Sequence, residues 1–483
     1  MSTALRSHAL RWWALAILAM TELVVVLDTT IVTIALPEAQ LELGLTDGQR
    51  QWVVTAYALA FGALLLLGGR IADYRGRKRT FMVGMIGFGA ASAWGGLAQS
   101  GVELIIARGV QGAFAALLAL AALAMVTVIF STGKERNLAF AIFGIVAGTG
   151  AAIGLLLGGV LTEFASWRWC LLVNVAFVII GMIGGARVLT ESKADGNDRY
   201  DVWGTITVTL GLGSLVYGFT LAEHGWGSPD TILFLALGVI LLTVFVLIQR
   251  RIAQPLLPLR VITHGVRAGS FLIQAVVGAV MIGSMLYLTF YFQLVLGMTP
   301  LLSGVANVAM TVVIFLLTPA TTALLNRFGP RPLMIGGPLF CAAGLFYLMG
   351  ITPDGSYWTQ VLPALILLGI GLAGLFVPLQ NLALTGVAPE DAGVASATVN
   401  STFHIGGSIG LAVFTVLYAG TVTNSLAAGA DQMTAFTDGY SAAFLGSGIA
   451  MVIAAVLAIV LIRGTKDELM PQWEAEDAAS YTH

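Results

Sequence analysis

The chain has 483 residues, of which 58% are hydrophobic and 10% carry a charge, and its formal net charge is -2. Soluble domains carry about 25% charged residues, so this composition excludes a soluble fold and, without a basic surface, a nucleic-acid-binding one. The two cysteines, Cys170 and Cys341, lie far apart in apolar runs and argue against a disulfide framework or a cysteine metal cluster. We therefore expect a membrane protein with many spanning helices.

The first residues resemble a signal peptide, because basic residues precede an apolar stretch over residues 6–20. The apolar run continues through Leu36 without a convincing cleavage site, so we expect a retained first helix. Fourteen apolar runs of about twenty residues, long enough to cross a bilayer, follow one another along the chain. These predicted spans cover residues 12–36, 51–69, 80–99, 102–130, 137–162, 167–187, 202–222, 230–249, 268–296, 302–326, 331–351, 358–385, 396–420 and 440–463.

Fourteen crossings place both termini on the same side of the membrane. With that side in the cytoplasm, the cytoplasmic segments hold 20 of the 23 Lys and Arg residues, whereas Arg50 and Arg168 lie outside and Arg108 lies within a helix. Positive charge accumulates in cytoplasmic loops, so we predict that both termini are cytoplasmic.

The densest of these loops is GGRIADYRGRKRTF, residues 68–81, between the second and third spans. Five Arg and Lys residues fall within ten of its positions, which is typical of a tight cytoplasmic connection. A weaker copy, ALLNRFGPR, follows the tenth span, with Asn326 where the first copy has Asp73. Such internal symmetry is typical of transporters built from repeated helical bundles.

Polar segments at residues 191–201 and 250–267 bracket the seventh and eighth spans and separate two groups of six helices. The predicted fold class is therefore an all-α integral membrane protein. We predict an N-terminal six-helix bundle (1–190), two linking transmembrane helices with flanking loops (191–265), a C-terminal six-helix bundle (266–465) and a cytoplasmic tail (466–483).

Three charged side chains lie inside the predicted spans, where charge is costly and therefore marks function. They are Glu22 and Asp28 in the first span and Arg108 in the fourth, and we assign all three to proton coupling. Asp28 could exchange a proton as its surroundings change, or it could form a static ion pair that locks helices together. Arg108 needs an acceptor, and the candidates are Asp28 or a backbone carbonyl of the first helix. Glu22 lies about 240° around the helix from Asp28, so it either lines a central cavity or packs toward a neighbour as a neutral acid.

Glycines crowd the fifth span at a spacing that lets another helix approach closely or slide past. They are Gly144, Gly148, Gly150, Gly154, Gly158 and Gly159. Five polar or aromatic side chains elsewhere could line a cavity, namely Gln111, Tyr287, Tyr291, Gln293 and His404. Anchoring at the lipid interface is the alternative for the two tyrosines, and a hydrogen-bonded structural role is the alternative for His404.

The sequence has no nucleotide-binding loop, no zinc-type His/Glu motif and no Ser/His/Asp set. We therefore expect neither an enzyme nor a cofactor, and the energy for transport would come from a proton gradient. One proton that crosses about 100 mV supplies about 2.3 kcal/mol, which sustains roughly fifty-fold accumulation of a neutral solute. A single titrating carboxylate would suffice.

These segments resemble the major facilitator superfamily over nearly the whole chain, and specifically its fourteen-helix drug:proton antiporter branch. LDTTIVTIALP resembles the first-helix motif of that branch, ARGVQG its fourth-helix motif, and APEDAGVASATVNSTFHIGGSIG a segment of its second half. The resemblance implies two six-helix bundles plus two linking helices, protonation at Asp28 and proton coupling through Arg108. It also implies a gating loop that latches the two halves in the outward-open state, formed by Gly69, Asp73, Arg75, Gly76, Arg77 and Lys78.

One departure concerns the fifth span, where the antiporter motif usually reads G-x-x-x-G-P-x-x-G-G. Residues 150–159 read GAAIGLLLGG, with Leu155 in the place of Pro. Gly150, Gly154, Gly158 and Gly159 preserve the close contact, whereas the helix distortion that Pro causes is expected to be absent. A leakier exchanger or a facilitated exporter is then the alternative to strict antiport.

We therefore predict a proton-coupled efflux transporter of the plasma membrane that exports small hydrophobic or cationic drugs and antibiotics by alternating access, as a monomer. A dedicated exporter of one endogenous metabolite or lipid is the alternative within transport. A membrane enzyme or a receptor would need a catalytic constellation or a sizeable extramembrane domain, and the sequence has neither. The expected partners are a small-molecule substrate and the lipid bilayer.

Overall fold

Long helices make up the computed structural model, which describes residues 3–130, 133–193, 200–222, 225–252, 254–388 and 391–469. In the first part of the chain they are α1 (Thr3–Leu43), α2 (Asp47–Arg75), α3 (Arg77–Gly96), α4 (Gly101–Ile129), α5 (Gly133–Phe164), α6 (Trp169–Val188), α7 (Val202–Leu221) and α8 (Pro229–Arg251). After the short α9 (Leu259–Ile262) come α10 (Gly265–Phe290), α11 (Pro300–Phe328), α12 (Pro330–Leu348), α13 (Leu362–Leu384), α14 (Ala392–Ala427), α15 (Gln432–Leu461) and the short α16 (Lys466–Leu469). Two π-helices, η2 (Tyr291–Val295) and η3 (Tyr357–Val361), adjoin α10 and α13.

The all-helical membrane fold expected from the sequence is confirmed in the described ranges. Thirteen helices are long and apolar enough to cross a membrane, and α3 matches them in length although Arg77, Lys78 and Arg79 at its start lower its hydropathy. Each predicted span coincides with one long helix, and α1, α2 and α14 extend beyond their apolar runs at both ends. The predicted tail beyond Leu469 lies outside the described residues.

Several helices begin where the sequence supplies a side-chain cap. The Thr46 hydroxyl accepts from the Gln49 backbone N–H, and the Gln49 side chain accepts from the Thr46 N–H, which completes a capping box before α2. Single side chains cap α4, α7, α8, α11 and α15 in the same way. These caps are Ser100, Asp201, Ser228, Thr299 and Asp431.

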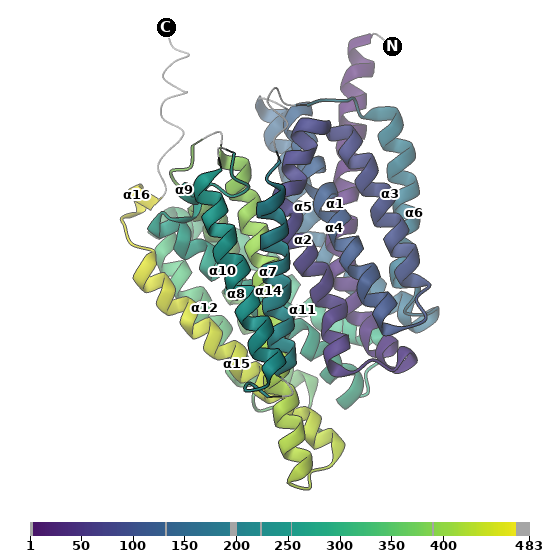
Figure 1. Ribbon diagram of the computed structural model, residues 1–483, viewed down its shortest axis with the longest axis vertical. Helices are drawn as coiled ribbons and strands as arrows, with labels where there is room; N and C mark the ends of the chain where they lie inside the picture. The colour runs from purple at the N-terminus through teal and green to yellow at the C-terminus, as the bar shows by residue number, and fades with distance from the viewer. Residues whose placement is uncertain are drawn as a thin grey trace.

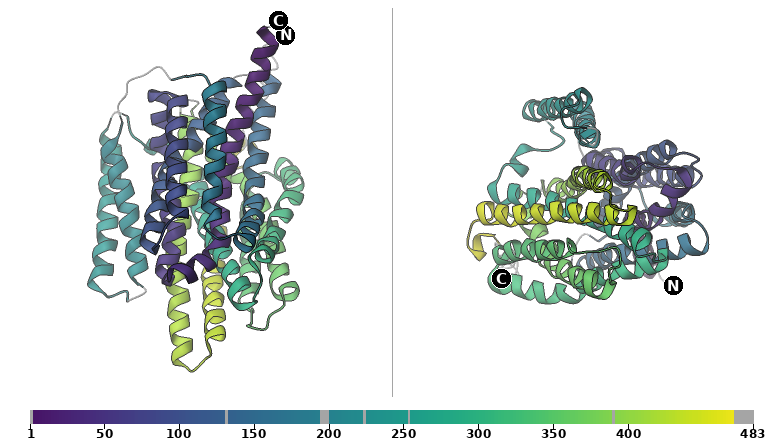
Figure 2. Two further views of the ribbon diagram at one scale, coloured as in Figure 1. Left: turned by 90° about the vertical axis from the view of Figure 1, so that its right-hand side faces the viewer. Right: turned by 90° about the horizontal axis from the view of Figure 1, so that it is seen from below.

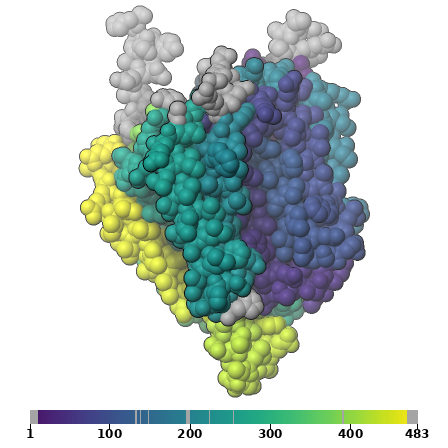
Figure 3. All heavy atoms as spheres, in the orientation of Figure 1, coloured from purple at the N-terminus to yellow at the C-terminus, as the bar shows by residue number. Residues whose placement is uncertain are grey.

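The long helices run roughly side by side between two ends of one bundle (Figure 1). We call the end that carries residues 69–81, 254–264 and 385–388 the loop end; it lies at the top of Figure 1. The opposite end, where α1 ends and α2 begins, is the far end. The hairpin between α14 and α15 projects beyond the other helices there (Figures 1 and 3).

Two helix pairs form the main contacts between α1–α6 and α10–α15. α2 packs on α14, and α5 packs on α11. The linking helices α7 and α8 pack on each other beside the bundle (Figure 2), and α7 covers the line where α2 meets α14. A small apolar cluster joins α2, α7 and α14 and consists of Leu59, Ala63, Leu212, Val216 and Ala412.

Candidate functional site

A buried ion pair joins α1 and α4. The carboxylate of Asp28 is fully buried, and its Oδ2 atom lies 2.5 Å from Nη1 of Arg108, whose side chain is 2% exposed. The structure therefore brings together the two residues that the sequence singled out, and Asp28 is the partner that Arg108 adopts. Both charges lie within membrane-spanning helices, where an unpaired charge would be expensive.

Two amides complete the shell of the Asp28 carboxylate. Nε2 of Gln111 and Nδ2 of Asn174 donate to Asp28 Oδ1 at 2.8 and 2.6 Å. Gln111 Nε2 also donates to the Ser92 hydroxyl at 2.7 Å, and Gln111 Oε1 accepts from Arg108 at 2.7 Å. Helices α1, α3, α4 and α6 thus meet at one carboxylate, which we call the Asp28 network.

Arg108 also binds α2. Its Nε donates to the backbone carbonyl of Val53 at 3.3 Å, and its guanidinium lies 4.2 Å from the centre of the Tyr57 ring. The carbonyl that Arg108 reaches therefore belongs to α2 rather than to the first helix. Gly112 allows this approach, because a Cβ there would lie 2.3 Å from the Tyr57 carbonyl oxygen.

Asn174, Ser92 and Tyr57 were not singled out from the sequence. Asn174 carried the clearest signal, since it is a polar side chain inside the apolar run LLVNVAF. Ser92 and Tyr57 carried none, because Ser is common in membrane helices and Tyr is expected at lipid interfaces. Only the packing of α2 and α3 on α4 brings these two to the network.

The hydrogen bonds of the Asp28 network depend on the balance of charge between Asp28 and Arg108. While Asp28 is ionised, its charge balances Arg108 and it accepts from both amides. A proton on Asp28 would cancel that balance and remove an acceptor, leaving Arg108 with an uncompensated charge. Removing one partner of a buried pair typically costs about 3–5 kcal/mol, so protonation would favour a rearrangement of α1 against α4.

The glycines of α5 connect this network to the second half of the molecule. A Cβ on Gly154 would lie 2.0 Å from the Thr30 hydroxyl, and one on Gly158 would lie 2.9 Å from the Ile31 carbonyl, so α5 lies directly on the helix that carries Asp28. Gly150 meets Val26 in the same way. On the other side of α5, a Cβ on Gly159 would lie 2.6 Å from the Leu301 backbone of α11.

Leu155, which stands where the antiporter motif has Pro, lies within this contact. Its side chain is fully buried, and α5 is continuous through it. The Leu155 carbonyl faces Gly304 of α11, where a Cβ would lie only 2.4 Å away. The backbones of α5 and α11 are thus in direct contact, and each helix contributes a glycine to it.

Glu22 lies apart from the network. It is partly exposed and lies about one and two-thirds turns from Asp28 toward the loop end. Within the described part of the chain, its carboxylate has no hydrogen bond or ion pair, so it differs from Asp28 in having no fixed partner.

The predicted gating loop is held by its own half. Asp73 pairs with Arg77 at 2.8 Å, and Lys78 Nζ donates to the carbonyls of Ala186 and Leu189 at 3.0 and 2.7 Å, at the end of α6. The carboxylate of Glu191 accepts from the backbone N–H groups of Lys78 and Arg79 and so caps α3. The latch between the two halves, expected for the outward-open state, stays a prediction.

The remaining residues of this loop have structural positions. Gly76 has a φ of 108°, which favours glycine, and a Cβ there would lie 2.7 Å from Glu191. Gly69 contacts Leu120 of α4. The Arg75 guanidinium lies 5.8 Å from the Tyr200 ring.

The five residues proposed to line a cavity occupy different places. Gln111 belongs to the Asp28 network. Tyr287 and Tyr291 are buried, and their hydroxyls pair with the Thr415 hydroxyl and the Thr352 carbonyl at 2.7 and 2.8 Å. Gln293 donates to the Ile34 carbonyl of α1 at 3.0 Å.

His404 packs between two aromatic rings. Its ring lies 4.6 Å from that of Phe61 in α2 and 5.3 Å from that of Phe403. Its Nδ1 atom is buried without a partner among the described residues. His404 therefore lies where α14 crosses α2.

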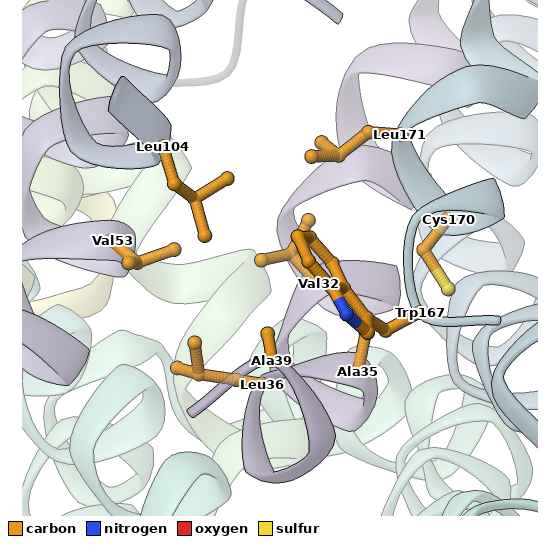
Figure 4. Close-up of a pocket in the computed structure, with 9 residues that line it drawn as sticks. All are labelled: Val32, Ala35, Leu36, Ala39, Val53, Leu104, Trp167, Cys170 and Leu171. Atoms are coloured by element: carbon orange, nitrogen blue, oxygen red, sulfur yellow. The ribbon is translucent and has the colours of Figure 1, made fainter. Parts of the chain in front are cut away.

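A small apolar pocket opens among α1, α2, α4 and α6 (Figure 4). Its volume is about 10 Å³, which is at the lower limit for one water molecule. It is lined by Val32, Ala35, Leu36, Ala39, Val53, Leu104, Trp167, Cys170 and Leu171. With apolar walls and this size, it is a packing gap rather than a substrate site.

In the part of the chain that the structure describes, fourteen long helices with a buried charge network among the first six define a class, the polytopic membrane transporters. The model of the Major Facilitator Superfamily matches residues 18–411, so the chain belongs to this family, as its motifs predicted. The function of the chain is accordingly transport across a membrane rather than catalysis.

Two relatives show which members of the family the chain is similar to. It is 44% identical over 460 residues to the puromycin resistance protein pur8 of Streptomyces alboniger, covering 94% of this chain and 91% of that protein. It is 38% identical over 454 residues to the cephamycin export protein CmcT of Amycolatopsis lactamdurans, covering 93% and 92%. Among solved structures, the fold is similar to an inward-facing, unoccupied bacterial homologue of the human lysosomal transporter Spinster, with a TM-score of 0.65, 16% identity and 94% and 97% coverage.

Proposed function

We propose that this protein exports small hydrophobic or cationic antibiotics or drugs across the plasma membrane in exchange for protons. The observation that carries the proposal is the Asp28 network, a carboxylate that is paired with Arg108 and hydrogen bonded within spanning helices. Relatives named for resistance to puromycin and export of cephamycin support the substrate class. Both termini are assigned to the cytoplasm, because the loop end carries the dense cluster of Lys and Arg.

Alternating access follows from the way the halves meet. α5 contacts α1, which bears Asp28, on one side and α11 of the other half on its other side. A change in the protonation of Asp28 shifts α1, and the glycine contacts transmit this shift to α11. The proton gradient supplies the energy.

The test of proton coupling is Asp28→Asn. We expect the variant to be expressed normally and to lose proton-driven efflux, at least about tenfold, because an amide cannot exchange a proton at this site. Substrate-dependent proton movement in inside-out vesicles is the measurement, with puromycin among a panel of antibiotics. Glu42→Gln is the matched control, since Glu42 also lies on α1 and pairs with an arginine, Arg168, at 2.8 Å.

The outcomes separate the alternatives. Full efflux against a gradient by Asp28→Asn would refute the assigned role of Asp28. Substrate movement without proton movement in the unaltered protein would identify a facilitated exporter. Transport of a single compound of the panel would indicate a dedicated exporter.

A further inference from the structure

Arg50 is a buried cation at the far end of the bundle. It lies in the first turn of α2, at the end that the charge distribution assigns to the outside, and is 2% exposed. Its guanidinium lies 4.3 Å from the centre of the Phe290 ring of α10 and 5.3 Å from that of Tyr418 of α14. A cation from one half of the molecule thus lies on aromatic faces of the other half.

These faces belong to a larger aromatic cluster of the second half. Tyr418 stacks on Tyr440 and Tyr287, with ring centres 5.1 and 5.7 Å apart. All of these rings, with Phe290, are at most 1% exposed. We call these four residues, Phe290, Tyr287, Tyr418 and Tyr440, the aromatic cage.

Two further contacts join the halves at the same end. Nε2 of Gln293 donates to the Ile34 carbonyl of α1 at 3.0 Å. The backbone N–H of Leu301, in the first turn of α11, donates to the Glu163 carboxylate of α5 at 3.0 Å. Three separate contacts therefore hold the far end closed.

The chemistry of the Arg50 contact suits repeated opening. The cage is neutral and attracts the guanidinium through its ring faces, so no charge is left behind in the second half when Arg50 leaves. The anionic partner of Arg50 is Asp47, at 3.0 Å on the same helix. Arg50 therefore keeps its ion pair whether or not the halves are in contact.

We propose that Arg50 is a gating residue, which closes the far end by entering the aromatic cage and opens it by leaving. The proposal rests on the alternating access described above. It assigns a transport role to a residue outside the Asp28 network and outside the loop at residues 68–81. The aromatic cage is the site that binds the Arg50 guanidinium when the far end is closed.

The test uses the full-length protein with Cys170 and Cys341 replaced by alanine. Spin labels at Leu41 of α1 and Met433 of α15, which are 75% and 44% exposed, report the separation of the halves at the far end. We expect Arg50→Gln to raise the ratio of open to closed molecules about tenfold, equivalent to about 1.4 kcal/mol. Export should fall in parallel, while Arg50→Lys should have a smaller effect because it lacks the planar guanidinium.

Arg168→Gln is the matched control. Arg168 also lies at the far end, 4.6 Å from the Trp167 ring and 2.8 Å from Glu42, but all of these groups belong to one half. Its replacement should leave the distance distribution unchanged.

An unchanged distribution in Arg50→Gln would overturn the proposal. If that variant fails to fold, Phe290→Leu removes a ring face from the cage, and the same comparison applies: a shift supports the gate, and no shift refutes it. The distances are compared between variants at one pH and without substrate, so the comparison requires neither substrate transport nor proton transport. Failure of the vesicle assay would therefore refute the proposed function without deciding the role of Arg50.

Discussion

At the scale of single residues, the carboxylates of Asp28 and Glu22 on α1 differ in the number of groups that bind them. Asp28 accepts from one guanidinium and two amides, whereas Glu22 on the same helix has no such partner among the described residues. The two carboxylates therefore differ in kind. Within the described ranges, Asp28 is held by a network of hydrogen bonds, and Glu22 is not.

Asn174 provides a direct test of that network. We expect Asn174→Ala to lower the thermal stability of the purified protein by roughly 1.5–3 kcal/mol, the range for hydrogen bonds to charged groups, and to reduce efflux. Thermal unfolding in detergent and vesicle transport are the measurements. Asn381→Ala, at an exposed position of α13, is the control, and equal losses in both variants would contradict the assignment.

Sequence reasoning found the charged members of the site and Gln111 but not the other neutral members. Asp28 and Arg108 are conspicuous because charge is rare in spanning helices. Ser92 and Tyr57 are not, since their residue types are common there and only the crossing of α2 and α3 with α4 selects them. Arg50 was missed because its helix begins at the Thr46 cap, before the apolar run does.

At the scale of helices, α5 lies very close to α1 and α11 because it has glycines where it meets them. Gly154 and Gly158 contact the α1 backbone region, and Gly159 contacts α11. A side chain at any of these positions would separate the helices that the mechanism requires to be in contact.

Gly154→Ala tests this helix contact. The added Cβ would lie 2.0 Å from the Thr30 hydroxyl and 2.8 Å from the Leu27 carbonyl, so α1 must shift. We expect a loss of about 1–3 kcal/mol of stability, typical of overpacking, and a severe loss of efflux. Gly144→Ala is the control on the same helix, since nothing lies within 4 Å of a Cβ there; a similar loss in the control would contradict the idea.

The helices themselves were predictable, because each needs about twenty apolar residues to cross a bilayer. Which helices pack against one another was not predictable from the apolar runs. The glycine spacing of α5 predicted a close helix contact, but only the structure shows that Gly154 contacts α1 and Gly159 contacts α11.

At the scale of the whole molecule, the segment after α8 connects both halves at the loop end. A guanidinium N–H of Arg70 in α2 donates to the Pro255 carbonyl. Farther along the same segment, Arg260 pairs with Asp391 beside α14, at 2.6 Å. The segment after α8 is therefore joined to the first half through Arg70 and to the second half through Arg260.

The Arg260–Asp391 pair predicts a dependence of stability on pH. Hydrogen bonds from Arg260 hold the pKa of Asp391 below its ordinary value, although burial opposes them. Because the pKa is lower in the folded protein, the stabilisation is present above the unfolded value of about 3.9 and is lost as the pH falls through the folded value.

Asp391→Asn should therefore lower stability by about 1 kcal/mol near pH 7 and flatten the acid side of the profile below about pH 4. Thermal unfolding in detergent at several pH values is the measurement. Asp354→Asn, at an exposed position, is the control. A profile for Asp391→Asn that parallels the unaltered protein would show that the pair does not contribute.

The sequence distance between Asp28 and its partners has a consequence for biosynthesis. Arg108 follows Asp28 by 80 residues, and Asn174 follows by 146. A chain made from its amino terminus presents Asp28 in the first helix before α4 and α6 exist. The carboxylate therefore lacks its arginine until α4 is made, and it gains the Asn174 amide only when α6 follows.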